Sequence, residues 1–205
     1  GQMRLHRPGE GTAERLAHTH IELHLDDGAC LQFTDPRRFG MVDLYPTRDE
    51  ACQPSLAGLG PEPLGPDFGP ACIREAAKGR RLPLKSFLMD QRVVAGLGNI
   101  YACEILYGAG LSPLRQARTL GPKRAGALHR ATRTVLEAAI EAGGSTLRDH
   151  RLADGSLGYF QHGFWVYDRA GRSCPDCQCD TARTGGIRRL IQSGRSTFYC
   201  PRMQR

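Results

Sequence analysis

Apolar and polar residues alternate near the start of the chain, which predicts β-structure there. Ile21, Leu23 and Leu25 are each separated by one polar residue, a period that is typical of a strand with one buried face. The Asp-Asp-Gly sequence at 26–28 is a hairpin turn signal, and the alternation resumes after it. We therefore expect a β-rich segment over residues 1–45.

The pattern changes after this segment. Proline and glycine interrupt residues 46–70 and predict a linker at a domain boundary, whereas residues 71–142 carry apolar positions at helical spacing. A strong helix is predicted to begin at Pro122, because proline is favoured in a first turn, and to end at the glycine pair 143–144. The apolar stripe expected to face the core comprises Leu128, Ala131, Val135, Leu136, Ala139 and Ile140.

The stretch Met89–Tyr101 indicates the end of one helix, a glycine turn and the start of another. Gly96 and Gly98 permit a tight turn, and Asn99 stands where a helix N-cap is expected. A helix N-terminus with unobstructed N–H groups is suited to bind a phosphate. A helical hairpin with a purely structural glycine turn fits the same pattern.

The charge of the chain favours a polyanionic partner. Its 205 residues include 28 Lys and Arg against 21 Asp and Glu, a formal charge of +7. A cluster of basic residues precedes the glycine turn: Arg80, Arg81 and Lys85. It is either a solvated face or a flank to the phosphate site. No apolar run approaches the roughly 18 residues that a membrane span needs.

The loop Asp35-Pro-Arg-Arg-Phe-Gly40 combines two arginines with an aromatic residue. It is either a solvated turn or a probe of DNA, in which Arg37 supplies charge and Phe39 a wedge between stacked bases. His18 lies close to it in sequence and is a candidate phosphate contact. The segment Asp154–Phe160 is rich in glycine and aromatic residues, and is either a cover over a ligand or a surface connection.

The eight cysteines divide into two groups. We expect four of them to be reduced, buried thiols: Cys30, Cys52, Cys72 and Cys103. The other four cluster near the end of the sequence: Cys174, Cys177, Cys179 and Cys200. This division favours a reducing compartment with one metal site over a disulfide framework.

A zinc knuckle takes four thiolates from two Cys-x-x-Cys pairs. The pair Cys174 and Cys177 is present, but the second pair is Cys200-x-x-Met203, and a neutral thioether is a poor zinc ligand. Three interpretations stay open: Cys179 completes the site, a three-cysteine site takes another fourth ligand, or no metal binds. The arginines and hydroxyl residues before the last cysteine suit a hairpin that contacts a phosphate backbone.

Taken together, these stretches closely resemble the formamidopyrimidine-DNA glycosylase family, bacterial base-excision enzymes for oxidised purines. The resemblance covers essentially the whole chain and rests on five motifs in the same order: Asp35–Gly40, Leu59–Leu64, Met89–Tyr101, Gly143–Asp149 and Gly194–Cys200. It implies an α+β fold with three parts: a partial N-terminal β-sandwich with linker (1–65), a helix–two-turns–helix domain (66–165) and a zinc-finger hairpin (166–205).

The resemblance assigns roles to individual residues. Arg37 and Phe39 match the pair that fills the gap left by the flipped base. Arg195 matches the zinc-finger arginine that contacts the phosphates flanking the lesion and is assigned to δ-elimination. Two residues match DNA-contacting positions, His18 and Arg81, and two match phosphate contacts at the helical turn, Lys85 and Asn99. The Asp154–Phe160 segment resembles the loop that covers the extruded base, which favours this family over endonuclease VIII.

One part of the family pattern has no match here. The family begins with a proline whose amine attacks C1′ of the damaged nucleotide, followed by a glutamate, and it uses a lysine from a downstream hairpin. Gly1 aligns instead with the glycine that ends a later family motif, His-Leu-Gly-Met-Ser/Thr-Gly. We therefore expect an N-terminally truncated copy that binds DNA without catalysing the reaction.

For the full-length protein the resemblance implies a bifunctional DNA glycosylase and AP lyase. It would remove oxidised purines, such as 8-oxoguanine and formamidopyrimidines, by Schiff-base β,δ-elimination. The expected partner is damaged double-stranded DNA and the expected cofactor is one Zn²⁺ per chain, in a monomer located in the bacterial cytoplasm at the nucleoid. Three alternatives stay open: an endonuclease VIII-like enzyme for oxidised pyrimidines, a non-catalytic damaged-DNA-binding module, and a structural interaction protein with a degenerate zinc hairpin.

Overall fold

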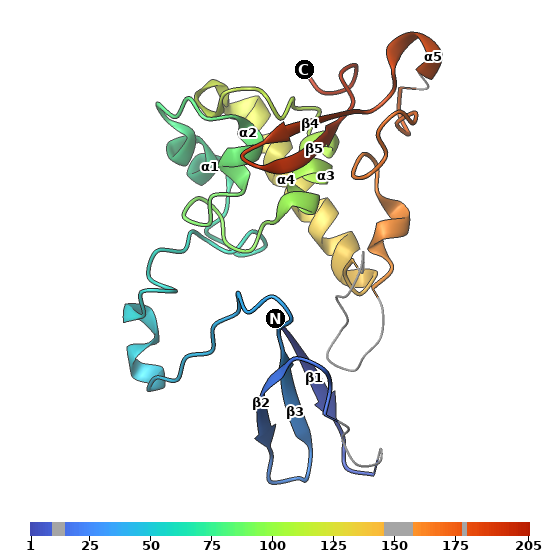
Figure 1. Ribbon diagram of the computed structural model, residues 1–205. Coiled ribbons are helices and arrows are strands. Elements are labelled where there is room, and N and C mark those ends of the chain that lie inside the picture. Colours follow the sequence, from blue (N-terminus) through green and yellow to red (C-terminus); the bar gives the residue numbers. More distant parts are fainter. Residues whose placement is uncertain (10–14, 146–157, 178–179) are drawn as a thin grey trace. The chain divides into compact units, whose positions relative to one another are not determined.

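A computed structural model describes residues 1–9, 15–145, 158–177 and 180–205. The chain forms two compact units, and each is described by itself. The first comprises Gly1–Thr47 with Ala139–Gly163, and the second comprises Arg48–Ala138 with Phe164–Arg205. Small sheets and helices occur together, which confirms the α+β fold (Figure 1). The three-part domain division stays a prediction.

The first unit is built on a three-stranded antiparallel sheet in the order β1-β3-β2 (Figure 1). Its strands are β1 (Gln2–His6), β2 (Thr19–His24) and β3 (Cys30–Thr34). The chain reverses over residues 25–29, where Gly28 adopts a φ of +83°. The predicted hairpin turn is therefore confirmed, and so is β-structure up to Thr34, whereas residues 35–45 contain no strand.

The second unit holds most of the helices and a two-stranded sheet. In chain order the remaining elements are η1 (Thr47–Cys52), α1 (Pro70–Ala77), α2 (Leu84–Leu88), α3 (Asn99–Gly108), η2 (Ala117–Thr119), α4 (Pro122–Glu141), η3 (Phe160–Gly163), α5 (Thr181–Thr184), β4 (Arg188–Gln192) and β5 (Arg195–Tyr199). The first residue of η1 and all of η3 belong to the first unit, as do the last residues of α4. Among the described helices, none is long and apolar enough to cross a membrane.

Helix α4 begins at Pro122, as the sequence predicts. Gly143 and Gly144 follow it with φ values of +68° and +80°, which a side chain would resist. Most of the predicted stripe is buried, with Leu128 fully inaccessible. Ile140 is 67% exposed, so its assignment to the core is wrong; Ala139, in the same last turn, is 3% exposed, which puts Ile140 on the solvent side of that turn.

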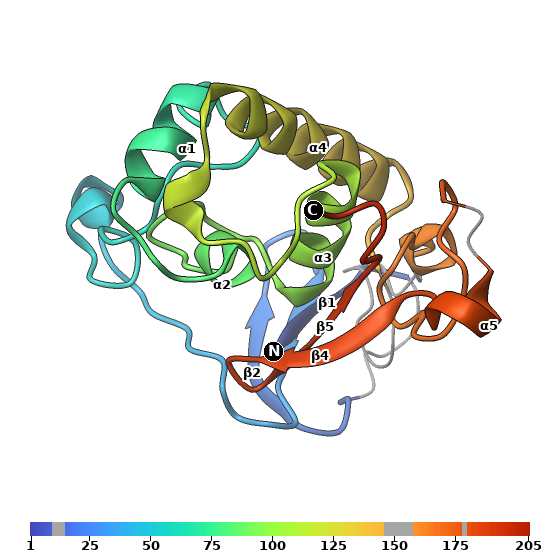
Figure 2. The same ribbon diagram turned by 90° about the horizontal axis from the view of Figure 1, so that it is seen from above.

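Strands β4 and β5 form a hairpin whose two-residue turn is Ser193–Gly194. Both residues have positive φ, 48° and 75°, as a type I′ turn requires. Strand β5 packs beside α3 (Figure 2), although the two elements are far apart in sequence. This packing brings the hairpin to the glycine turn that precedes α3.

Candidate nucleic-acid interface and metal site

The side chain of Gln91 stabilises the turn between α2 and α3. The N–H of Gly96 donates to Gln91 Oε1 at 2.7 Å, and Gln91 Nε2 donates to the carbonyl of Leu97 at 3.1 Å. Gly96 has a φ of +75°, a conformation that favours glycine. The side chain of Gln91 therefore replaces backbone hydrogen bonds that the tight turn cannot make by itself.

The N-cap of α3 is Gly98 and not Asn99, which is the first helical residue. No side chain caps this helix end, so its first N–H groups have no acceptor within the helix. Asn99 Nδ2 donates instead to the carbonyl of Ser196 at 3.0 Å and to Tyr167 Oη at 3.3 Å. The side chain of Asn99 thus connects the helix to the hairpin, and its phosphate contact stays a prediction that we assign to the backbone N–H.

Lys85, in α2, is buried against the hairpin. It is 1% exposed, and its Nζ donates to Thr197 Oγ1 at 2.7 Å and to the carbonyl of Ser196 at 3.1 Å. Burial lowers the pKa of Lys85 below its ordinary value; the Cys103 thiol opposes this shift and the Arg195 guanidinium adds to it. These two bonds fix the hairpin to α2, and the phosphate contact of Lys85 stays a prediction.

The tip of the hairpin and the end of α2 enclose a small pocket of about 160 Å³. Its lining residues come from both segments: Lys85, Ser86, Met89, Asp90, Gln192, Ser193 and Arg195. Ser86 Oγ lies 3.4 Å from Ser193 Oγ across the pocket. The structure therefore brings Arg195, an exposed cation, to the predicted phosphate site, although more than a hundred positions separate the hairpin from α2.

The basic group before the glycine turn does not act as one cluster. Arg80 Nη1 lies 3.4 Å from Asp90 Oδ2, and Arg92 contacts the same carboxylate at 2.9 and 3.0 Å. Hydrogen bonds from Arg92, together with both positive charges, hold the pKa of Asp90 below its usual value. Arg81 is exposed, and its DNA contact stays a prediction.

In the first unit, the loop after β3 presents an aromatic residue to solvent. Asp35 closes the loop by accepting the N–H of Gly40, a bond that is the main cause lowering the pKa of that carboxyl. Phe39 is 84% exposed, and the Arg37 guanidinium lies 5.7 Å from its ring centroid. His18 is also exposed, with a φ of +63°. An aromatic side chain this exposed on a closed loop is available to a partner.

Three cysteines converge in the second unit. The sulfur of Cys174 lies 3.0 Å from that of Cys177 and 3.5 Å from that of Cys200, and the remaining pair is 3.7 Å apart. Burial raises the pKa of the Cys174 thiol, but hydrogen bonds, first from Tyr107 and then from Cys177, outweigh it and lower that pKa to about 7. Since the thiolate is the metal-binding form, this cluster fits a borderline or soft cation.

The fourth position of the cluster differs from a four-cysteine knuckle. The knuckle turn itself is present, because Gln204 donates its N–H to the carbonyl of Cys200 and accepts the N–H of Cys200 on Oε1 at 2.8 Å. Met203, in the place of the last cysteine, is 39% exposed. Cys179 lies outside the described residues, as does most of the Asp154–Phe160 segment.

Sequence reasoning missed Glu104, which is 1% exposed in the middle of α3. Its carboxylate accepts the backbone N–H groups of Trp165, Val166 and Tyr167 at 2.7, 3.0 and 2.8 Å. Burial raises the pKa of Glu104, and these three N–H groups oppose the shift. A single acid within the apolar helix 99–108 was the available signal. Glu104 fixes the segment that leads into the cysteine cluster.

The sequence of the chain is similar to that of known DNA-repair proteins. Residues 59–151 match the formamidopyrimidine-DNA glycosylase H2TH domain, which places the chain among proteins with this helical DNA-repair domain. The chain belongs to the formamidopyrimidine-DNA glycosylase family. It is 54% identical over 198 residues to formamidopyrimidine-DNA glycosylase of Rhodospirillum rubrum, covering 97% of this chain and 70% of the relative. It is 53% identical over 190 residues to that of Cereibacter sphaeroides, covering 92% and 65%.

Solved structures give the same result. The MutM (Fpg) protein of Thermus thermophilus matches with a TM-score of 0.83 and 44% identity over 93% of this chain and 70% of its own. Lactococcus lactis Fpg in complex with abasic-site DNA matches with a TM-score of 0.84 and 31% identity, over 98% and 70%. The chain thus spans between 65% and 70% of the length of these relatives.

Proposed function

We propose that the full-length protein is a DNA glycosylase and AP lyase that removes oxidised purines from duplex DNA. Three solved structures that are similar to this chain are complexes with DNA that contains Fapy-dG, an abasic site or carbocyclic 8-oxo-G. One observation carries the proposal for this chain: the uncapped N-terminus of α3 and the guanidinium of Arg195 both lie at the junction of hairpin and helical turn. Helix N–H groups and an arginine together are suited to bind phosphate.

We assign the remaining contacts from the family resemblance. Arg37 and Phe39 enter the duplex where the damaged base is flipped out, which offsets part of the few kcal/mol of lost stacking. His18 and Arg81 contact the DNA backbone. Arg195 also assists the final δ-elimination. The monomeric state and the cytoplasmic, nucleoid-associated location stay predictions.

We further propose that Cys174, Cys177 and Cys200 hold one Zn²⁺, with Cys179 or another donor as fourth ligand. Bound zinc would supply structural stabilisation by fixing the segment 174–177 to the end of β5. The thiolates, and the hydrogen bond from Tyr107 Oη to Asp176 at 2.7 Å, hold this segment against α3. Arg195 is then presented to DNA on a rigid hairpin.

A polypeptide of these 205 residues is proposed to bind damaged DNA without cleaving it, because no residue matches the proline, glutamate and lysine that supply the family's chemistry. The secondary amine of that proline forms the iminium on which β-elimination depends.

The test combines binding with trapping. Gel-shift affinities are measured for duplexes that carry 8-oxoguanine, an oxidised pyrimidine or no lesion, at several salt concentrations, and each mixture is treated with borohydride. We expect preference for 8-oxoguanine, affinity that falls steeply with salt, and no covalent adduct. Preference for the pyrimidine lesion would favour the endonuclease VIII-like alternative. Weak binding that does not respond to salt would favour an interaction protein, and an adduct would refute the proposed inactivity.

A further inference from the structure

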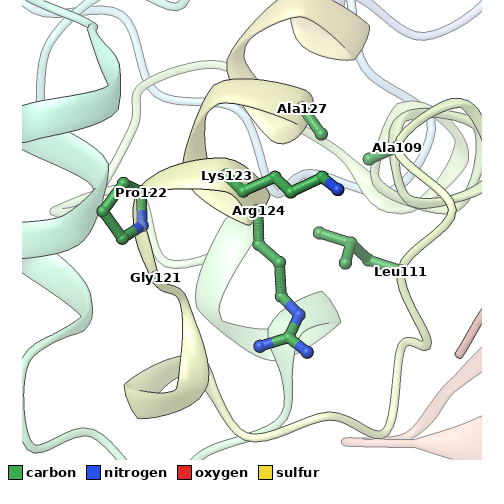
Figure 3. A pocket seen from close by; sticks show the side chains of 7 residues that line it. All are labelled: Ala109, Leu111, Gly121, Pro122, Lys123, Arg124 and Ala127. Atoms are coloured by element: carbon green, nitrogen blue, oxygen red, sulfur yellow. The ribbon is translucent and has the colours of Figure 1, made fainter.

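A second, larger pocket lies where α3 ends and α4 begins (Figure 3). It has a volume of about 500 Å³ and belongs entirely to the second unit. Its floor is apolar, formed by Ala109, Leu111 and Ala127, with Leu111 only 4% exposed. Figure 3 shows the side chains of Lys123 and Arg124 leaving the first turn of α4 beside this floor. The pocket therefore combines an apolar base with a cationic rim.

The charge around this pocket has one sign. Both rim side chains are exposed, and among the described residues neither has a carboxylate within ion-pair distance. Arg124 Nη1 donates to the carbonyl of Thr119 at 3.2 Å, which holds its guanidinium at the rim. The sequence from 105 to 136 contains six Lys and Arg and no Asp or Glu. The first N–H groups of α4 add the positive end of a 20-residue helix.

This pocket is separate from the proposed phosphate site. That site lies at the N-terminal end of α3, whereas Ala109 and Leu111 follow its C-terminal end, and ten residues of helix rise about 15 Å. A phosphate backbone also has no use for an apolar floor, which instead suits a large apolar side chain.

We propose that this pocket docks an acidic peptide segment of a partner protein. One large apolar side chain of the peptide would cover Leu111 and Ala127, while neighbouring carboxylates pair with Lys123 and Arg124. Since the pocket and the phosphate site lie at opposite ends of α3, the chain binds the peptide and DNA at the same time. The proposal does not depend on the glycosylase activity.

The test uses fluorescence anisotropy with a fluorescein-labelled synthetic peptide of four aspartates followed by phenylalanine. Two matched peptides replace the phenylalanine by serine or the aspartates by asparagine. The full 205-residue chain is compared with Lys123→Glu/Arg124→Glu, with Ala127→Gln, which fills the pocket without adding charge, and with the control Lys78→Glu, an exposed lysine that directly follows α1. Circular dichroism checks that each variant folds.

We expect saturable binding of the first peptide, weakened about tenfold or more by the double charge reversal and several-fold by Ala127→Gln, with Lys78→Glu unchanged. Both matched peptides should bind more weakly, and saturating 8-oxoguanine duplex should not displace the first peptide. The proposal is overturned if the chain does not bind the peptide, if the serine peptide binds equally well, or if Ala127→Gln has no effect. It is also overturned if the double reversal weakens duplex binding as much as peptide binding, because the pocket would then belong to the nucleic-acid surface.

Discussion

Replacing Glu104 by glutamine should loosen the contact between α3 and the segment before the cysteine cluster. One carboxylate oxygen accepts the N–H groups of Val166 and Tyr167, and the other accepts that of Trp165. A glutamine can keep the first two bonds, but its NH₂ group then faces the N–H of Trp165. One buried donor loses its acceptor, which costs about 1–3 kcal/mol.

The alanine variant separates the hydrogen bonds from the shape of the side chain. Glu104→Ala leaves all three N–H groups without this acceptor and also creates a cavity, so its cost should reach about 3–5 kcal/mol. Trp165 is the one tryptophan of the chain, and its fluorescence reports on the affected segment directly. Urea unfolding followed by that fluorescence should show midpoints lower by roughly 0.5–1.5 M for the glutamine variant.

Glu75→Gln serves as the matched control, because Glu75 is 79% exposed and pairs only with Lys78 at 3.8 Å in the described structure. Its unfolding midpoint should stay close to that of the original chain. Equal midpoints for Glu104→Gln and Glu75→Gln would refute the reasoning, since the buried carboxylate would then not hold the segment.

Four further outcomes are expected. Hydrogen bonding from Arg92 lowers the pKa of Asp90 in the folded state, so the ionised Asp90 stabilises the fold above its unfolded-state pKa and loses this effect as pH falls through its folded-state pKa. Asp90→Asn should therefore lower the free energy of unfolding by under about 1 kcal/mol in urea titrations at neutral pH, and should have no effect at strongly acid pH. Lys85→Met should leave the helices folded but speed amide exchange in β4 and β5, measured by mass spectrometry; unchanged exchange would contradict its positioning role. Arg195→Ala should weaken duplex binding and reduce the slope of log affinity against log salt by about 1. The zinc content of the purified chain should be one ion per chain, and that of Cys174→Ser less than half as much. Equal zinc content in both proteins would exclude this cluster as the zinc site.

Local signals in the sequence were sufficient for the elements that depend on neighbours in the chain. The Asp-Asp-Gly turn, the helix that begins at Pro122 and the cysteine cluster were all predicted, since each depends on residues a few positions apart or on strong residue-type preferences. Alternation also predicted β2, but Leu23 and Leu25 are each 47% exposed. Periodicity indicates which side chains share a face and does not indicate what covers that face.

The candidate site was harder to predict because distant segments decide how its side chains are used. Lys85 and Asn99 are polar residues beside a phosphate-type turn, which favours a direct contact, yet both direct their side chains to the carbonyl of Ser196. Glu104 gains its partners 61 to 63 positions later. No local pattern contains these pairings, so the sequence could not indicate that these side chains also hold distant segments together.

These long-range partners also set an order of events during synthesis. Lys85 is synthesised 111 residues before Ser196, whose carbonyl accepts its hydrogen bond. Leu111 is synthesised 93 residues before Gln204, whose side-chain amide donates to the Leu111 carbonyl. Chains emerge at about 5–20 residues per second, so the buried ammonium and the carbonyl of Leu111 stay exposed to water for several seconds. These contacts of the helical part are therefore completed only after β5 arrives, and during that interval a chaperone or a protease has access to the groups that β5 later covers.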